Sequence, residues 1–191
     1  MLFSDKKYRK HMYFVSTDWP GGLYASPSMP GSRPGGLIAV CWAALVAMGK
    51  EGYMNTAREI FECSKKILSE LNKIPDIKVL GNPPAMVLAF AAEGFNIFAV
   101  SDAMHRKGWS LNALHRPNSV HLCVTKKTVG KEQKFIDDLK ECIDEVKNNM
   151  DLAKEGNAPM YGMASSFPDR SAVKDIVYNY LDILLETKED Y

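Results

Sequence analysis

A glycine- and proline-rich loop at residues 20–36 contains the residue types best suited to binding an anion. Residues 31–36 of this loop read GSRPGG and lead directly into an apolar segment. A serine hydroxyl, free backbone N–H groups and the N-terminus of a helix together form an anion site, and phosphate is its usual occupant. Arg33 adds a guanidinium of fixed geometry. The commoner alternative is a plain N-cap serine, with the glycines and prolines forming turns.

The histidines and cysteines offer weaker chemistry. The histidines are scattered along the chain, at His11, His105, His115 and His121. The cysteines are equally separated, at Cys41, Cys63, Cys123 and Cys142. Neither set contains the short spacings that a metal site or a redox motif needs. We therefore expect no metal site, histidines with structural roles, and buried, reduced thiols of the kind found in cytosolic proteins.

Composition places the chain among ordinary globular proteins. It has 191 residues, 46% of them hydrophobic and 25% charged, with a formal net charge of +1. This balance gives no reason to expect nucleic acid or an anionic membrane as a partner. The chain starts without the apolar core of a signal peptide. Its longest apolar run, Leu37–Met48, is too short to span a bilayer and is typical of a buried helix, so we predict no membrane segment.

Hydrophobic periodicity predicts the elements that would position the loop. We expect a strand at 11–16, which has no partner upstream, and strands at 77–80, 86–90, 109–114 and 120–125. We expect helices at 37–49, 52–73, 96–107, 131–154 and 169–186, with Gly49 ending the first and Asp169 capping the last. Residues 52–191 then form a small α+β domain with a mainly antiparallel sheet. Residues 1–51, with the loop 20–36, are the end of a larger domain.

Several spaced motifs resemble one enzyme family, the sphingosine-1-phosphate lyases. They read SDKKYR at 4–9, GGLYASPSMPGSRPGG at 21–36, GNP at 81–83, KGWSLNAL at 107–114 and MYGMA at 160–164. Their order and spacing match over essentially all of the chain. The resemblance implies the C-terminal portion of a fold-type-I pyridoxal-phosphate enzyme, an α/β fold that is truncated here. This family is related to the group II amino-acid decarboxylases and forms obligate dimers with the active site at the subunit interface.

The resemblance also implies an activity and roles for individual residues. Such lyases use pyridoxal 5'-phosphate to cleave a phosphorylated sphingoid base into a long-chain aldehyde and phosphoethanolamine. Ser32 would contact the phosphate of the cofactor held by the partner subunit, with the backbone of Gly31 beside it. Tyr24 would point into the interface site, and Tyr161 would line the entrance to the substrate channel. Arg33 would pin the loop. The simpler alternative for both tyrosines is packing with a satisfied hydroxyl.

The sequence departs from the family in one respect that matters for activity. The lysine that forms the Schiff base lies in a His-Lys-Tyr-Gly segment in the family, and these 191 residues contain no such segment. Lys6 and Lys7 fit a solvated turn and do not replace it. We therefore assign no catalytic residue to this chain and expect it to be inactive alone.

Two alternatives remain open for the chain's role. It could be a non-catalytic partner that completes the interface site of a full-length or split subunit, or a fragment of another group II decarboxylase. By resemblance, the enzyme is cytoplasmic or faces the cytosol from the endoplasmic reticulum. Without the rest of a large domain, the helix at 37–48 should expose its apolar face and cause association.

Overall fold

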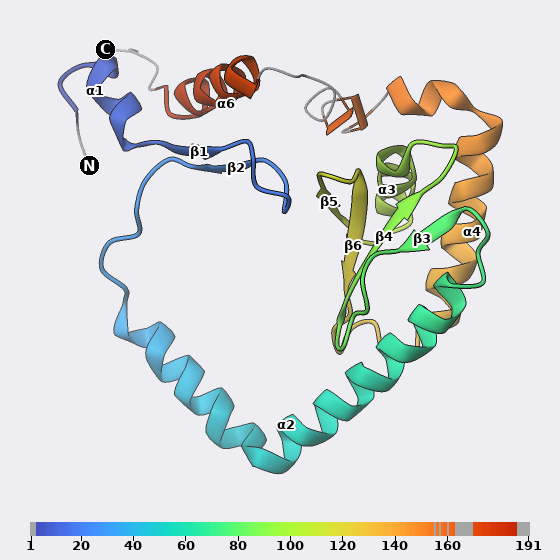
Figure 1. The fold of residues 1–191 in the computed structure, drawn as a ribbon. Coiled ribbons are helices and arrows are strands. Elements are labelled where there is room, and N and C mark those ends of the chain that lie inside the picture. The colour runs from blue at the N-terminus through green and yellow to red at the C-terminus, as the bar shows by residue number, and fades with distance from the viewer. Residues whose placement is uncertain (1–2, 155, 157, 160, 163–169, 187–191) are drawn as a thin grey trace.

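The structure, a computed structural model, describes residues 3–154, 156, 158–159, 161–162 and 170–186. Its helices are α1 (Lys6–Arg9), α2 (Gly35–Leu71), α3 (Ile97–Arg106), α4 (Glu132–Asn148) and α6 (Arg170–Leu184), with 3-10 turns at Lys10–Met12 and Met150–Lys154. Its strands are β1 (Phe14–Ser16), β2 (Tyr24–Ser26), β3 (Ile77–Val79), β4 (Val87–Ala92), β5 (Asn112–Leu114) and β6 (Ser119–Cys123). Figure 1 shows an open arrangement in which α2 connects the β1–β2 hairpin to the α/β unit.

The α/β unit is built on a four-stranded antiparallel sheet in the order β3-β4-β6-β5. Side chains alternate along β4 and β6, so the buried apolar residues of these strands share one face of the sheet. Helix α3 packs against β5 and β6, and α4 packs against α3 (Figure 1). The largest side chains of this core are almost fully buried and come from the sheet, from α3 and from α4: Leu88, Phe90, Val120, Met104, Phe135 and Leu139. The predicted small antiparallel sheet and its covering helices are therefore confirmed.

Helix α2 is a single element with a sharp bend. Gly49 has φ of +59° and ψ of −179°, which are not helical values, and glycine adopts this left-handed region without a steric penalty. The predicted end of the first helix at Gly49 is thus a break within α2. Beyond it, Cys63, Ile67 and Leu71 are buried against the core. Before it, residues 35–48 are all exposed, which agrees with the exposed apolar face predicted for this helix.

The length of α2 affects the prediction that this chain contains no membrane segment. At 37 residues, with a mean hydropathy of 1.3 in its most apolar stretch, α2 is long and apolar enough to cross a membrane by length and composition. Sequence reasoning counted only the run up to Met48. None of that stretch is buried inside the chain, and a core helix of a soluble protein passes the same test.

The N-terminal segment agrees with the prediction only in part. A strand does lie at 14–16, and its partner β2 lies downstream, within the loop 20–36, where no strand was predicted; the two pair in antiparallel register. The expected solvated turn at Lys6 and Lys7 is instead the first part of helix α1. The predicted N-cap, Asp169, and the motif residues 163–164 lie outside the described residues.

An ion pair between Arg9 and Asp182 holds the C-terminal helix against this N-terminal segment. Figure 1 shows α6 beside α1 and β1. One carboxylate oxygen of Asp182, on α6, accepts hydrogen bonds from Arg9 Nη2 at 2.8 Å and from Tyr13 Oη at 2.9 Å. Burial alone would raise the pKa of Asp182, but these hydrogen bonds and that of Lys10 lower it overall. Because a lowered pKa keeps the carboxylate charged at neutral pH, the ion pair stabilises the fold there and is lost only in acid.

Candidate functional site

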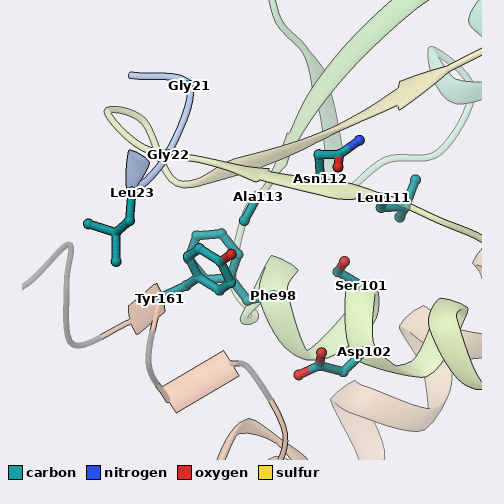
Figure 2. A pocket seen from close by; sticks show the side chains of 10 residues that line it. All are labelled: Gly21, Gly22, Leu23, Phe98, Ser101, Asp102, Leu111, Asn112, Ala113 and Tyr161. Carbon is teal, nitrogen blue, oxygen red and sulfur yellow. The ribbon is translucent and has the colours of Figure 1, made fainter. Parts of the chain in front are cut away.

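A cavity of about 230 Å³ lies where four distant parts of the chain meet. Its lining comes from the loop before β2 (Gly21, Gly22, Leu23), from α3 (Phe98, Ser101, Asp102), from β5 and the residue before it (Leu111, Asn112, Ala113), and from Tyr161. Figure 2 shows Tyr161 stacked over Phe98 on one side of the cavity, with Ser101 and Asp102 below it on α3. The cavity is therefore apolar and aromatic at one end and polar along the α3 side.

Helix α3 presents its contribution to the cavity on a single face. Asn96 caps the helix, since its side-chain oxygen accepts a hydrogen bond from the N–H of Phe98 at 2.9 Å. Residues three and four positions after Phe98 lie on the same side of a helix, which places Ser101 and Asp102 beside the ring. Sequence reasoning did not select these residues, although their spacing was a signal that could have found them.

The loop before β2 is held against strand β5 by its backbone. The N–H of His115 donates to the carbonyl of Pro20 at 2.9 Å. Gly22 has φ of +115°, and a Cβ on it would lie 3.1 Å from the carbonyl oxygen of Ala113. Glycine at this position therefore allows both the backbone conformation and the close approach, and residues 21–23 become one wall of the cavity.

The motif at 107–114 is anchored by side chains of α4. The indole N–H of Trp109 donates to Asp138 Oδ2 at 2.7 Å, and its ring meets Phe135 edge-on with 5.1 Å between centroids. Hydrogen bonds from Lys134 and then Trp109 lower the pKa of the Asp138 carboxyl. The charged carboxylate thus fixes Trp109, and with it the chain that continues into the cavity wall.

Tyr161 lies at the cavity, but the structure does not test its predicted role. Its ring centroid is 5.6 Å from that of Phe98 and 5.7 Å from that of His115. His115 is only 3% exposed, which agrees with a structural histidine. Tyr24, by contrast, is on β2 and 47% exposed, with its ring against Phe14 and Trp19. It does not line this cavity.

The loop at 31–36 forms a second candidate site, and the structure distinguishes it from a plain helix cap. Helix α2 begins at Gly35, Pro34 is its N-cap, and no side chain caps it. The alternative of Ser32 as the N-cap is therefore wrong. The first turn has no acidic residue, and a Cβ at Gly31, Gly35 or Gly36 would meet no atom within 4 Å.

Arg33 and Ser32 complete the geometry of this second site. Arg33 Nη1 donates to the carbonyl of Gly31 at 2.8 Å, a local contact that agrees with the prediction that Arg33 pins the loop. Ser32 is exposed. The structure does not bring Ser32 and Tyr24 into the cavity that contains Tyr161.

The thiols and the remaining ligand-type residues do not form a site in the described part of the chain. No group of three or more His, Cys, Asp or Glu residues there could hold a metal ion. Cys63 and Cys142 are buried as predicted, and burial raises the pKa of each to about 11. The same prediction is wrong for Cys41 and Cys123, which are exposed. Cys41 lies in the first half of α2, which no other described part of the chain covers.

Comparison with known proteins supports the resemblance. The chain is 53% identical over 186 residues to the sphingosine-1-phosphate lyase of Dictyostelium discoideum, covering 97% of this chain and 35% of that protein. It is 40% identical over 189 residues to sphingosine-1-phosphate lyase 1 of Rattus norvegicus, covering 98% of this chain and 33% of that protein. No protein-family model matches the chain.

A solved structure shows the same fold. The sphingosine-1-phosphate lyase of Burkholderia pseudomallei superposes on 96% of this chain and 37% of its own, with a TM-score of 0.64 and 33% identity. The chain is thus a homologue of the sphingosine-1-phosphate lyases over nearly all its residues, with their mixed α/β architecture. It spans about a third of the length of the curated relatives it matches.

Proposed function

We propose that this chain is the C-terminal part of a pyridoxal-phosphate-dependent lyase that cleaves a phosphorylated sphingoid base into a long-chain aldehyde and phosphoethanolamine. The homology over 97% of the chain supports the family activity. The observation that carries the chain's own contribution is the uncapped N-terminus of α2, preceded by Ser32 and held by Arg33. In this proposal residues 1–51 belong to the large domain and residues 52–191 form the C-terminal domain. The enzyme acts in the cytoplasm or on the cytosolic face of the endoplasmic reticulum.

The residues of the loop fit the phosphate of the cofactor. The hydroxyl of Ser32 can donate to a phosphate oxygen, and the free N–H groups at Gly35 and Gly36 can do the same. No acidic side chain in the first turn opposes an anion. When bound, the cofactor supplies the electron sink for cleavage of the C–C bond, while the protein binds and orients the reactants.

We further propose that the phosphate bound here belongs to the partner subunit of a homodimer. All of residues 31–48 are exposed, and residues 37–48 carry apolar side chains, which is typical of a surface that another chain covers. Tyr24 would complete the interface site from the adjoining hairpin. Tyr161, at the 230 Å³ cavity, would line the path of the substrate.

Replacing Ser32 with alanine tests the phosphate role. In a lyase that contains this chain, Ser32→Ala should weaken binding of pyridoxal phosphate about tenfold or more, because one hydrogen bond to a charged group is lost. The measurement is a cofactor titration of the apoenzyme followed by absorbance. Ser28→Ala is the matched control, since Ser28 is exposed in the same loop and contributes only its carbonyl oxygen to a hydrogen bond from Ser26. Equal cofactor affinities for the two variants would contradict the proposal.

The isolated 191-residue chain should not hold the cofactor covalently. Incubation with pyridoxal phosphate, reduction with borohydride and peptide mapping should give only scattered, substoichiometric labelling of exposed lysines such as Lys6 and Lys7. A specific adduct at one lysine in a one-to-one ratio would show that this chain carries its own covalent site. In that case the prediction that the chain is inactive alone would fail.

The exposure of residues 31–48 also favours a second candidate, a non-catalytic partner chain. Such a chain would dock through this surface and complete the phosphate site of a full-length subunit. Co-purification with a full-length lyase, together with a gain of activity that Ser32→Ala removes, would distinguish this role from that of a subunit fragment.

A further inference from the structure

A carboxylate at the floor of the cavity holds the chain segment that carries Tyr161. Asp102 Oδ2 accepts a hydrogen bond from the backbone N–H of Ala158 at 2.9 Å. Ala158 is fully buried and belongs to the main core cluster. The described residues 158–159 and 161–162 are helical, so Asp102 caps the start of this turn from a different element.

A glycine allows the carboxylate to come this close. Gly156 has φ of +64°, and a Cβ placed on it would lie 2.7 Å from Asp102 Oδ2. Any other residue at this position would meet both an unfavourable backbone conformation and the carboxylate itself. Glycine at position 156 therefore leaves room for the Asp102 carboxylate. This observation is separate from the hydrogen bond to Ala158.

The two elements touch at two points. Phe98 and Asp102 are four residues apart and share one face of α3, and both Ala158 and Tyr161 contact that face. Asp102 bonds to Ala158 at one point, and the rings of Phe98 and Tyr161 pack at the other with 5.6 Å between centroids. Two contacts of this kind fix both the position and the rotation of the turn; Figure 2 shows Phe98 and Asp102 on α3, with the ring of Tyr161 beside Phe98.

We propose that Asp102 is a positioning residue, which sets the location of the Tyr161 ring at the mouth of the substrate path by anchoring the turn through Ala158. This inference rests on the proposed role of Tyr161 in the lyase. Asp102 acts through the backbone and not through the substrate. A carboxylate at this place would repel a phosphorylated substrate, which agrees with an anchoring role and not with a binding one.

Hydrogen–deuterium exchange of the chain tests the anchor directly. Asp102→Ala should raise the exchange rate of the Ala158 amide about tenfold or more, because the acceptor is lost. Asp102→Asn keeps a side-chain carbonyl oxygen and should restore most of the protection. Asp144→Ala, on the exposed side of α4, controls for loss of an aspartate. Unchanged exchange in Asp102→Ala, or equal rates in the Asn and Ala variants, would overturn the proposal.

A second pair of variants tests the fit at Gly156. Gly156→Ala should by itself raise exchange at Ala158, since the new Cβ displaces the carboxylate. In the Asp102→Ala background the same change should have a smaller effect, because the close atom is gone and only the backbone strain remains. Equal effects in both backgrounds would mean that Asp102 and Gly156 do not meet as inferred.

Kinetics of the whole lyase separate this inference from the proposed function. Asp102→Ala should raise KM for the phosphorylated sphingoid base several-fold with a smaller change in kcat, and Asp102→Asn should restore KM. In a Tyr161→Ala background, Asp102→Ala should add little, because the residue that it positions is absent. If Tyr161→Ala leaves KM unchanged, the proposed role of Tyr161 fails while the exchange results still decide whether Asp102 anchors the turn. Full additivity of the two changes would overturn positioning through Tyr161.

Discussion

Replacing Phe135 with alanine should lower the free energy of unfolding by about 3–5 kcal/mol. Phe135 is 0% exposed, lies on α4 within the main core cluster and meets the ring of Trp109 edge-on. Alanine would remove the ring from a closely packed interior and leave a cavity that neighbours on separate elements cannot fill. This is the cost expected where α3, α4 and the sheet meet.

Chemical denaturation measures the effect. The urea midpoint of Phe135→Ala, followed by circular dichroism, should fall while the slope of the transition stays the same. Phe61→Ala is the matched control, because Phe61 is 41% exposed on α2, and its replacement should change stability by less than about 1 kcal/mol. A loss below about 1 kcal/mol for Phe135→Ala would contradict the packing described here.

The same substitution has a consequence for the candidate site. Phe135 supports Trp109, which Asp138 holds by a hydrogen bond of 2.7 Å. Trp109 begins the segment that continues into Leu111 and Ala113 at the cavity wall. The core therefore supports the cavity wall through Trp109. A Phe135→Ala variant that remains folded should still have a less ordered cavity wall.

The isolated chain should associate through the first half of α2. Its exposed apolar side chains include Ile38 at 69%, Trp42 at 66% and Leu45 at 53% exposure. These three residues are spaced at i, i+4 and i+7, so they form a continuous apolar stripe on one side of the helix. An uncovered stripe of this kind drives association in water.

Sedimentation velocity at micromolar concentration should therefore give a mass above the 21.3 kDa of one chain. Replacing Ile38 and Leu45 with lysine should shift the population towards the monomer and raise the dissociation constant at least tenfold, through lost burial and charge repulsion. The control is the double variant Asn55→Lys, Ser69→Lys. It adds the same charge to exposed positions of α2 and should leave association unchanged. A wild-type chain that sediments as a monomer would contradict this prediction.

Local patterns predicted most of the elements correctly. Helix α4 and the strands around the 116–118 turn lie where hydrophobic periodicity predicted them. The ends of these elements differ from the prediction by a few residues. Gly49 was recognised as a break because only glycine readily takes the left-handed conformation observed there. Strand β2 was missed, because a loop rich in glycine and proline carries no strand signal and β2 exists only through its pairing with β1.

The candidate anion site at 31–36 and the cavity differ in how far sequence could describe them. The loop at 31–36 is local: its glycines, Ser32 and the helix start are adjacent in the chain, so its role could be proposed from the sequence. Only its details needed coordinates, such as Pro34 as the N-cap and the bond from Arg33 to Gly31. The resemblance selected Tyr161 but offered no reason to select Asp102.

The sequence by itself predicted most of the elements, an anion-binding role for the loop before α2 and the resemblance to the lyases, because each depends on residues close together in the chain. Only the tertiary structure decided that residues 21–23, α3, β5 and Tyr161 enclose one cavity. It also decided that Asp102 bonds to Ala158, 56 positions away. The physical reason is that such contacts depend on how separate elements pack. That packing is set by the whole core, and neither periodicity nor a short motif contains it.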